Sequence, residues 1–198
     1  MKLGIFGGTF DPVHWGHLLA ARAALEELRL DRLLFVPAAR SPFKSDSPAP
    51  AEFRLRLLRL ALAGMPQFEI DSREITRQGP SYTIQTLREI ASSHAGAELF
   101  FLIGSDHVGH LGQWHEAGEL AGMATFVAIP RPGSPSPVFP HPFRGIGLKG
   151  WPLELSATGI RDRIRSGLPI DHLTPPAVAQ AIMSSLPYPG SGTPTLQH

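Results

Sequence analysis

The 198-residue sequence contains no cysteine, which excludes disulfide bonds and thiolate metal sites. It also lacks a run of about 18 apolar residues, the length that a membrane-spanning helix requires. Its first residues lead directly into an apolar segment, without the basic and apolar regions of a secretory signal peptide. These absences favour a cytoplasmic protein, and we expect no membrane partner.

An excess of charge of one sign is also missing. The 18 lysines and arginines nearly balance the 17 aspartates and glutamates, and the formal net charge is +1. Nucleic-acid-binding proteins usually present a basic face, so this balance argues against nucleic acid as a partner. A bound anion would have to be held by local groups. A homo-oligomer is compatible with the sequence, which does not define an oligomeric state.

Short apolar runs alternate with amphipathic segments along the chain. We predict buried strands at residues 3–6, 33–37, 68–71, 98–103, 125–129 and 151–155, and helices at 18–30, 51–63, 114–120, 156–166 and 175–186. Strands separated by helices indicate a parallel sheet with crossover helices. The prediction is therefore one α/β domain over residues 1–187, with a Rossmann-like parallel sheet and helices on both faces. Residues 130–142 are expected to form an irregular surface segment, and residues 188–198 a flexible tail.

A glycine-rich segment, residues 7–18 (GGTFDPVHWGHL), follows the first predicted strand and precedes the first predicted helix. Such a turn is where α/β proteins bind nucleotide phosphates, because glycines let backbone N–H groups approach an anion at a helix N-terminus. The segment is neither a P-loop nor a dinucleotide G-x-G-x-x-G turn. Instead it carries His14 and His17, whose spacing places both on one side of the first helical turn. The alternative is a tight corner with solvated histidines.

This segment resembles the His-x-Gly-His signature of the nucleotidylyltransferase superfamily, and its full residue pattern is similar to that of bacterial nicotinate-nucleotide adenylyltransferases. The resemblance implies a nucleotidylyltransferase domain over residues 1–187 that uses ATP with Mg²⁺ and nicotinate mononucleotide as its partners. It assigns catalysis to His14 and His17. It also implies that the preceding turn binds ATP phosphates through Gly7, Gly8, Thr9 and Phe10.

A second motif, residues 155–161 (LSATGIR), places hydroxyl groups at the start of a predicted helix and a guanidinium one turn later. It could be simple helix capping with a solvated arginine, or a phosphate site. It resembles the family motif Ile-Ser-x-Thr-x-Ile-Arg, which binds the β- and γ-phosphates of ATP. The resemblance implies phosphate contacts from Ser156 and Thr158, and a catalytic role for Arg161 in holding pyrophosphate.

Two further segments are expected to bind the ligands. Ser81 or Thr83 caps a predicted helix with the apolar face Ile84, Leu87 and Ile90, and Ser81-Tyr82-Thr83 resembles the family segment that receives the nicotinate carboxylate. Gly104, Asp106 and Trp114 match family positions that line the nucleotide and pyridine sites. Without the resemblance, Asp106 would be a turn residue and Trp114 a core residue. A metal site from the nearby His107, His110 and His115 is not expected.

Lys44 and Arg131 are assigned to the mononucleotide by the same resemblance. The segment containing Lys44 departs from the family pattern Pro-Pro-His-Lys, because Ser41 and Phe43 replace the first proline and the histidine. The expected reaction is adenylyl transfer from ATP to nicotinate mononucleotide, giving deamido-NAD and pyrophosphate. The same chemistry on nicotinamide mononucleotide or phosphopantetheine, or a non-catalytic nucleotide sensor, remains an alternative.

Overall fold

The computed structural model describes residues 1–39, 49–77, 79–133, 135–185 and 187–188. Six parallel strands form one sheet in the order β3-β2-β1-β4-β5-β6. Their bounds are β1 Lys2–Gly8, β2 Arg32–Pro37, β3 Phe68–Ile70, β4 Glu98–Gly104, β5 Thr125–Ile129 and β6 Gly145–Gly147. This is the strand order of a doubly wound nucleotide-binding sheet, in which ligands bind beyond the carboxyl ends of the central strands. The predicted parallel sheet is confirmed.

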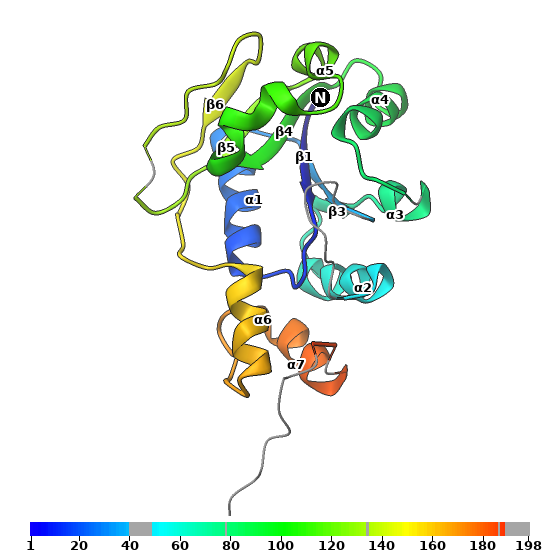
Figure 1. Cartoon of the computed structure of the whole chain (residues 1–198). Coiled ribbons are helices and arrows are strands. Elements are labelled where there is room, and N and C mark those ends of the chain that lie inside the picture. The colour runs from blue at the N-terminus through cyan, green and yellow to red at the C-terminus, as the bar shows by residue number, and fades with distance from the viewer. Residues whose placement is uncertain (40–48, 78, 134, 186, 189–198) are drawn as a thin grey trace, which may run out of the picture.

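Helices cover both faces of this sheet (Figure 1). Against one face pack α1 (Trp15–Glu27) and α2 (Ala51–Leu62). The helices α6 (Ala157–Arg165) and α7 (Pro176–Ser185) extend the same core beyond the carboxyl ends of the strands. The other face is covered by α4 (Thr83–Ser93), a 3₁₀ helix (Ser105–Gln113) and α5 (Ala117–Met123). The short helix α3 (Arg73–Arg77) precedes α4.

The two cores follow from strand periodicity. Along β4, Phe100 and Leu102 point to the α1 face, whereas Leu99, Phe101 and Ile103 point to the α4 face. Successive side chains of a strand alternate between faces, so a strand buried on both sides becomes a continuous apolar run. The same alternation in β1, β2 and β5 explains why these segments were recognisable as strands.

Several predicted elements require correction. Residues 151–155, predicted as the last strand, form no strand, and the sheet instead ends with β6. Helix α1 begins at Trp15 rather than at residue 18, so that His17 lies within its first turn. Neither Ser81 nor Thr83 caps α4, because the N-cap residue is Tyr82 and its side chain makes no capping hydrogen bond.

The packed part of the chain extends beyond α7. Tyr188, which we expected to be the first residue of the tail, is only 2% exposed and belongs to the α1-side core. The rest of the expected tail lies outside the described residues. Between β5 and β6 the described residues of the 130–142 segment form no helix or strand, as expected.

Candidate active site

A cavity of about 440 Å³ opens at the carboxyl ends of β1, β4 and β5. Three segments that the sequence analysis singled out line it, namely residues 7–18, 104–114 and 156–161. The loop after β2 contributes Ala38, while Lys44 lies outside the described residues. The end of β5 also lines the cavity through Ile129, Pro130 and the predicted contact Arg131. Residues 150–153, before α6, line it as well and were not indicated by the sequence.

The glycine-rich turn forms the floor of the cavity, where Gly7, Gly8, Thr9 and Phe10 all line it. Phe10 has a left-handed backbone (φ 49°), and its ring is buried against Phe6, Phe35 and His17. A Cβ atom on Gly8 would lie 3.0–3.2 Å from the Phe10 ring. The absence of a side chain at Gly8 therefore lets Phe10 pack beneath the cavity and support the ring of His17.

His14 and His17 stack in the cavity wall with their ring centroids 3.8 Å apart. The backbone N–H of His14 donates to Nδ1 of His17 at 3.2 Å. Because Nδ1 accepts this bond, the neutral imidazole of His17 carries its proton on Nε2. His17 therefore has an Nε2–H donor in a fixed ring orientation.

His14 is 5% exposed, and burial lowers its pKa from 6.5 to about 4, with a smaller contribution from the charge of Arg131. Its Nδ1 is buried and has no hydrogen-bond partner among the described residues. A Cβ atom on Gly16 would lie 3.0 Å from Nδ1 and Cε1 of His14, so the glycine leaves space for the ring. His14 is thus a neutral imidazole at physiological pH.

Arg161 extends from α6 across the cavity to the glycine-rich turn. Its Nη1 donates to the carbonyl oxygen of Asp11 at 2.8 Å, and its Nη2 donates to Oγ1 of Thr158 at 3.2 Å. Ser156 is the N-cap of α6, because its Oγ accepts the N–H of Gly159 at 3.1 Å. Ser156, Thr158 and Arg161 all line the cavity. Helix capping and a cavity-facing arginine therefore occur together here.

Arg54, on α2, is a structural determinant that the sequence analysis missed. It is 1% exposed, and its guanidinium donates to the carbonyls of Thr9 (2.7 Å), Ala38 (2.8 Å), Ala39 (3.3 Å) and Ala49 (3.2 Å). Burial lowers the pKa of Arg54, and the charge of Asp11 opposes this effect. Arg54 thus fixes the glycine-rich turn relative to the end of β2. Its sequence signal is an arginine on the apolar face of α2, three and four residues before Leu57 and Leu58.

Ser81, Thr83 and Trp114 also line the cavity. Oγ of Ser81 accepts the N–H of Ala39 at 3.1 Å, which ties this loop to the end of β2. Trp114 packs edge-on against Phe101 and Phe126, with centroid distances of 6.2 and 6.4 Å. Tyr82 does not line the cavity, and its ring instead lies 4.6 Å from that of His115.

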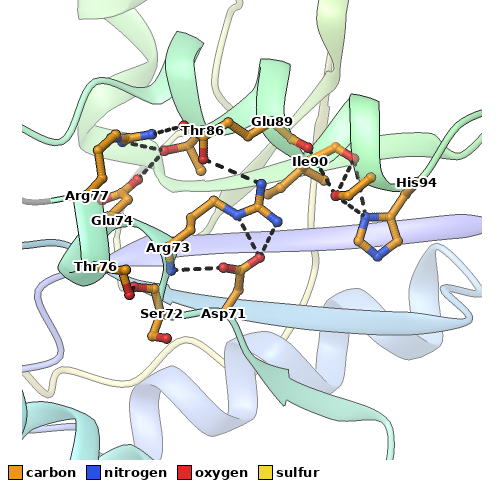
Figure 2. Close-up of polar contacts among 11 residues, drawn as sticks. Asp71, Ser72, Arg73, Glu74, Thr76, Arg77, Thr86, Glu89, Ile90 and His94 are labelled. Carbon is orange, nitrogen blue, oxygen red and sulfur yellow. Dashed lines mark hydrogen bonds and ion pairs between the residues drawn. The ribbon is translucent and has the colours of Figure 1, made fainter.

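Helices α3 and α4 are joined by a polar network (Figure 2). The carboxylate of Glu74 lines the cavity and accepts a hydrogen bond of 2.5 Å from Oγ1 of Thr86, both residues being buried. Arg77 bridges Thr86 (3.3 Å) and Glu89 (2.6 Å), and Arg73 pairs with Asp71 (2.7 Å). This network holds the start of α4 in place at the cavity edge.

Asp106 and Arg131 form a pair at the rim, with Oδ1 and Nε 3.6 Å apart and both side chains about half exposed. Gly104 and Arg131 line the cavity, whereas Asp106 does not. Within the described residues, no group of three or more histidines, aspartates or glutamates is arranged to hold a metal ion. No helix in the described part of the chain is long and apolar enough to cross a membrane.

A doubly wound parallel sheet whose cavity brings together a glycine-rich turn, two stacked histidines and an arginine is the architecture of a nucleotide-binding enzyme. The model of the cytidylyltransferase-like family matches residues 5–172, most of the chain. These features and this match define the class as a cytidylyltransferase-like nucleotidyltransferase.

The chain is similar to proteins named "probable nicotinate-nucleotide adenylyltransferase". The protein of Geobacillus kaustophilus is 43% identical, and the match covers 89% of this chain and 81% of that protein. That of Thermus thermophilus is 44% identical, covering 90% and 94%, and that of Methylacidiphilum infernorum is 40% identical, covering 94% and 92%. The chain belongs to the nicotinate-nucleotide adenylyltransferase family.

A solved structure shares the fold at much lower sequence identity. It is that of Plasmodium falciparum nicotinic acid mononucleotide adenylyltransferase complexed with NaAD, which is 18% identical with a TM-score of 0.75. The match covers 94% of this chain and 97% of that one. The predicted α/β fold class is therefore confirmed.

Proposed function

We propose that this protein transfers the adenylyl group of ATP to nicotinate mononucleotide, giving deamido-NAD and pyrophosphate. The observation that carries the proposal is the meeting of His14, His17 and Arg161 at one cavity, in a chain 40–44% identical to nicotinate-nucleotide adenylyltransferases. An oxygen of the mononucleotide 5′-phosphate attacks the α-phosphorus of ATP. The bond from that phosphorus to the α–β bridging oxygen breaks, and its electron pair leaves with pyrophosphate.

This reaction requires no general base, because the attacking phosphate is already ionised at neutral pH. The main obstacle is bringing two anions together, so catalysis consists of positioning and of stabilising charge that develops on phosphate oxygens. The Nε2–H of His17 is a donor for the α-phosphate or the bridging oxygen. His14 is neutral and acts beside it as a hydrogen-bonding group rather than as a cation.

Arg161, Ser156 and Thr158 are assigned to the departing pyrophosphate. Arg161 is positioned by the carbonyl of Asp11 and by Thr158, so its planar fork is oriented before the nucleotide binds. The glycine-rich turn Gly7, Gly8, Thr9 and Phe10 is assigned to ATP, as are Gly104 and Asp106. Arg131, at the rim, is assigned to the mononucleotide.

The acceptor is assigned to the part of the cavity lined by Ser81, Thr83 and Trp114. The uncapped start of α4 offers backbone N–H donors to a carboxylate, and Trp114 offers an aromatic surface to a pyridine ring. Tyr82 and Lys44 remain predicted contacts of the mononucleotide.

Mg²⁺ is assigned to the triphosphate. Mg²⁺ commonly keeps several waters and binds through substrate phosphates, so the ion would be held mainly by phosphate oxygens and water. When bound, the ion neutralises phosphate charge. The protein side chains would bind and orient the resulting complex.

Pyrophosphate release from ATP, measured with nicotinate mononucleotide and separately with nicotinamide mononucleotide, tests the proposal. We expect a higher kcat/KM with the acid. Preference for the amide, or for phosphopantetheine in a third reaction, would reassign the acceptor. ATP binding without pyrophosphate release for any acceptor would indicate a nucleotide sensor. In the same assay, His17→Ala should lower kcat at least 100-fold while changing the Kd of ATP little, and near-normal turnover would refute its assignment.

A further inference from the structure

The carboxylate of Asp11 lies inside the protein beneath the glycine-rich turn, and the residue is 1% exposed. Its Oδ1 accepts a hydrogen bond of 2.6 Å from the hydroxyl of Tyr188, and its Oδ2 accepts a bond of 3.4 Å from the N–H of Ala49. The Tyr188 side chain itself is nearly inaccessible to solvent. A residue beyond the last helix is therefore bonded directly to the turn that begins the proposed active site.

The backbone carbonyl of Asp11 contacts Arg161, a residue that lines the cavity. This carbonyl accepts the Nη1 hydrogen of Arg161 at 2.8 Å. Nε of Arg161 is buried and has no hydrogen-bond partner among the described residues. Within that part of the chain, the Asp11 carbonyl and Thr158 accept the hydrogen bonds that hold the guanidinium. Any rotation of the Asp11 peptide would therefore turn the guanidinium that lines the cavity.

A buried carboxylate requires hydrogen-bond donors, because leaving it without a partner carries a large desolvation cost. Among the described residues, the cations whose charge acts on the Tyr188 hydroxyl are Arg54 and Arg161. Arg54 is already committed to four backbone carbonyls. If the hydroxyl of Tyr188 were lost, the Asp11 carboxylate would compete for Arg161 and draw it away from the cavity. Burial and the bond to Asp11 raise the pKa of Tyr188, so the hydroxyl stays protonated and remains a donor.

We propose that Tyr188 is a positioning residue for Arg161: its hydroxyl satisfies the Asp11 carboxylate, which fixes the Asp11 carbonyl and leaves the guanidinium in place to bind phosphate oxygens. The proposal rests on the adenylyl-transfer function proposed above. It differs from a purely structural role because the effect of Tyr188 on catalysis passes through one side chain. If Arg161 is replaced by a residue without a guanidinium, loss of the Tyr188 hydroxyl should no longer lower kcat.

The test is a double-mutant cycle of Tyr188→Phe and Arg161→Lys, with kcat and KM measured by pyrophosphate release. Phenylalanine keeps the ring and its packing but lacks the hydroxyl. Lysine keeps the charge of Arg161 but cannot form the planar fork. A matched control, Ile182→Val, removes one methylene from a fully buried residue of α7, in the same core as Tyr188. The Tm of every variant is measured.

We expect Tyr188→Phe to lower kcat about tenfold in the wild-type background and less than twofold in the Arg161→Lys background. Its Tm should fall by about 5 °C, whereas Ile182→Val should lower Tm by a few degrees without changing kcat. An equal fold-change in kcat in both backgrounds, or a kcat loss in Ile182→Val that tracks its Tm, would assign Tyr188 to stability alone.

Wild-type protein, assayed with both pyridine mononucleotides, separates this proposal from the proposed function. If the wild type releases no pyrophosphate, the proposed function fails. The Kd of ATP is then measured for the wild type, the two single variants and the double variant of the cycle. A non-additive change in that Kd would retain the positioning role of Tyr188 in nucleotide binding, and an additive change would refute it.

Discussion

The buried imidazole of His14 makes a specific prediction about how stability depends on pH. Burial lowers its pKa from 6.5 to about 4 in the folded protein. At about 1.4 kcal/mol per pKa unit, this difference corresponds to about 3 kcal/mol. His14 is 5% exposed, so solvent screening reduces this figure little.

The sign follows from which state binds the proton first. Above pH 6.5, His14 is neutral in both states and does not make stability depend on pH. As the pH falls from 6.5 to 4, the unfolded chain is protonated before the folded protein, and the free energy of unfolding falls by up to about 1.4 kcal/mol per pH unit. Below pH 4 the loss levels off at about 3 kcal/mol.

Urea unfolding of the wild type and of His14→Gln at half-unit steps from pH 7.5 to 4 measures this contribution. All other titrating groups are shared, so the difference between the two curves isolates His14. We expect the wild type to lose about 3 kcal/mol more than the variant over this range. The control is His110→Gln, a change at an exposed histidine of the 3₁₀ helix, which shows whether replacing a histidine outside the cavity has the same effect. Parallel curves for the wild type and His14→Gln would refute a depressed pKa at His14.

Two further predictions concern the residues that support the site. Gly16→Ala adds a Cβ atom 3.0 Å from the His14 ring, so we expect about a tenfold lower kcat with unchanged circular dichroism, and unchanged kcat would show that the ring position is unimportant. Arg54→Met leaves buried backbone carbonyls without donors, at about 1–3 kcal/mol each. We therefore expect urea unfolding to show a loss of at least 3 kcal/mol, compared with less than 0.5 kcal/mol for Arg56→Met on the exposed face of the same helix; a loss below 1 kcal/mol for Arg54→Met would contradict this role.

The central strands were predictable because each is buried on both faces and bounded by turn residues. The errors occurred where that signal fails. Residues 151–155 include three large apolar side chains but pair with no strand, and β6 is a three-residue edge strand with glycine at both ends. Helix α3 has five residues, four of them charged or polar, which is too short to show a helical period.

The positions of the site loops were predictable for a different reason. Motifs that follow parallel strands must meet at the carboxyl edge of the sheet, so the convergence of residues 7–18, 104–114 and 156–161 follows from topology. Arg54 and Tyr188 were missed because their partners are backbone carbonyls and one carboxylate far away in sequence. Neither residue belongs to a motif, and pairings at such separations are not visible in a single sequence.

The bond between Tyr188 and Asp11 also bears on the order of events during synthesis. The six strands are complete once Gly147 has been made, but the contacts that close the turn around Asp11 come from Arg161 and Tyr188. At roughly 5–20 residues per second, the intervening ~40 residues take about 2–8 s to translate. The sheet can therefore form before the contacts around Asp11 are made, and the cavity reaches its final arrangement only once Tyr188 has joined the core.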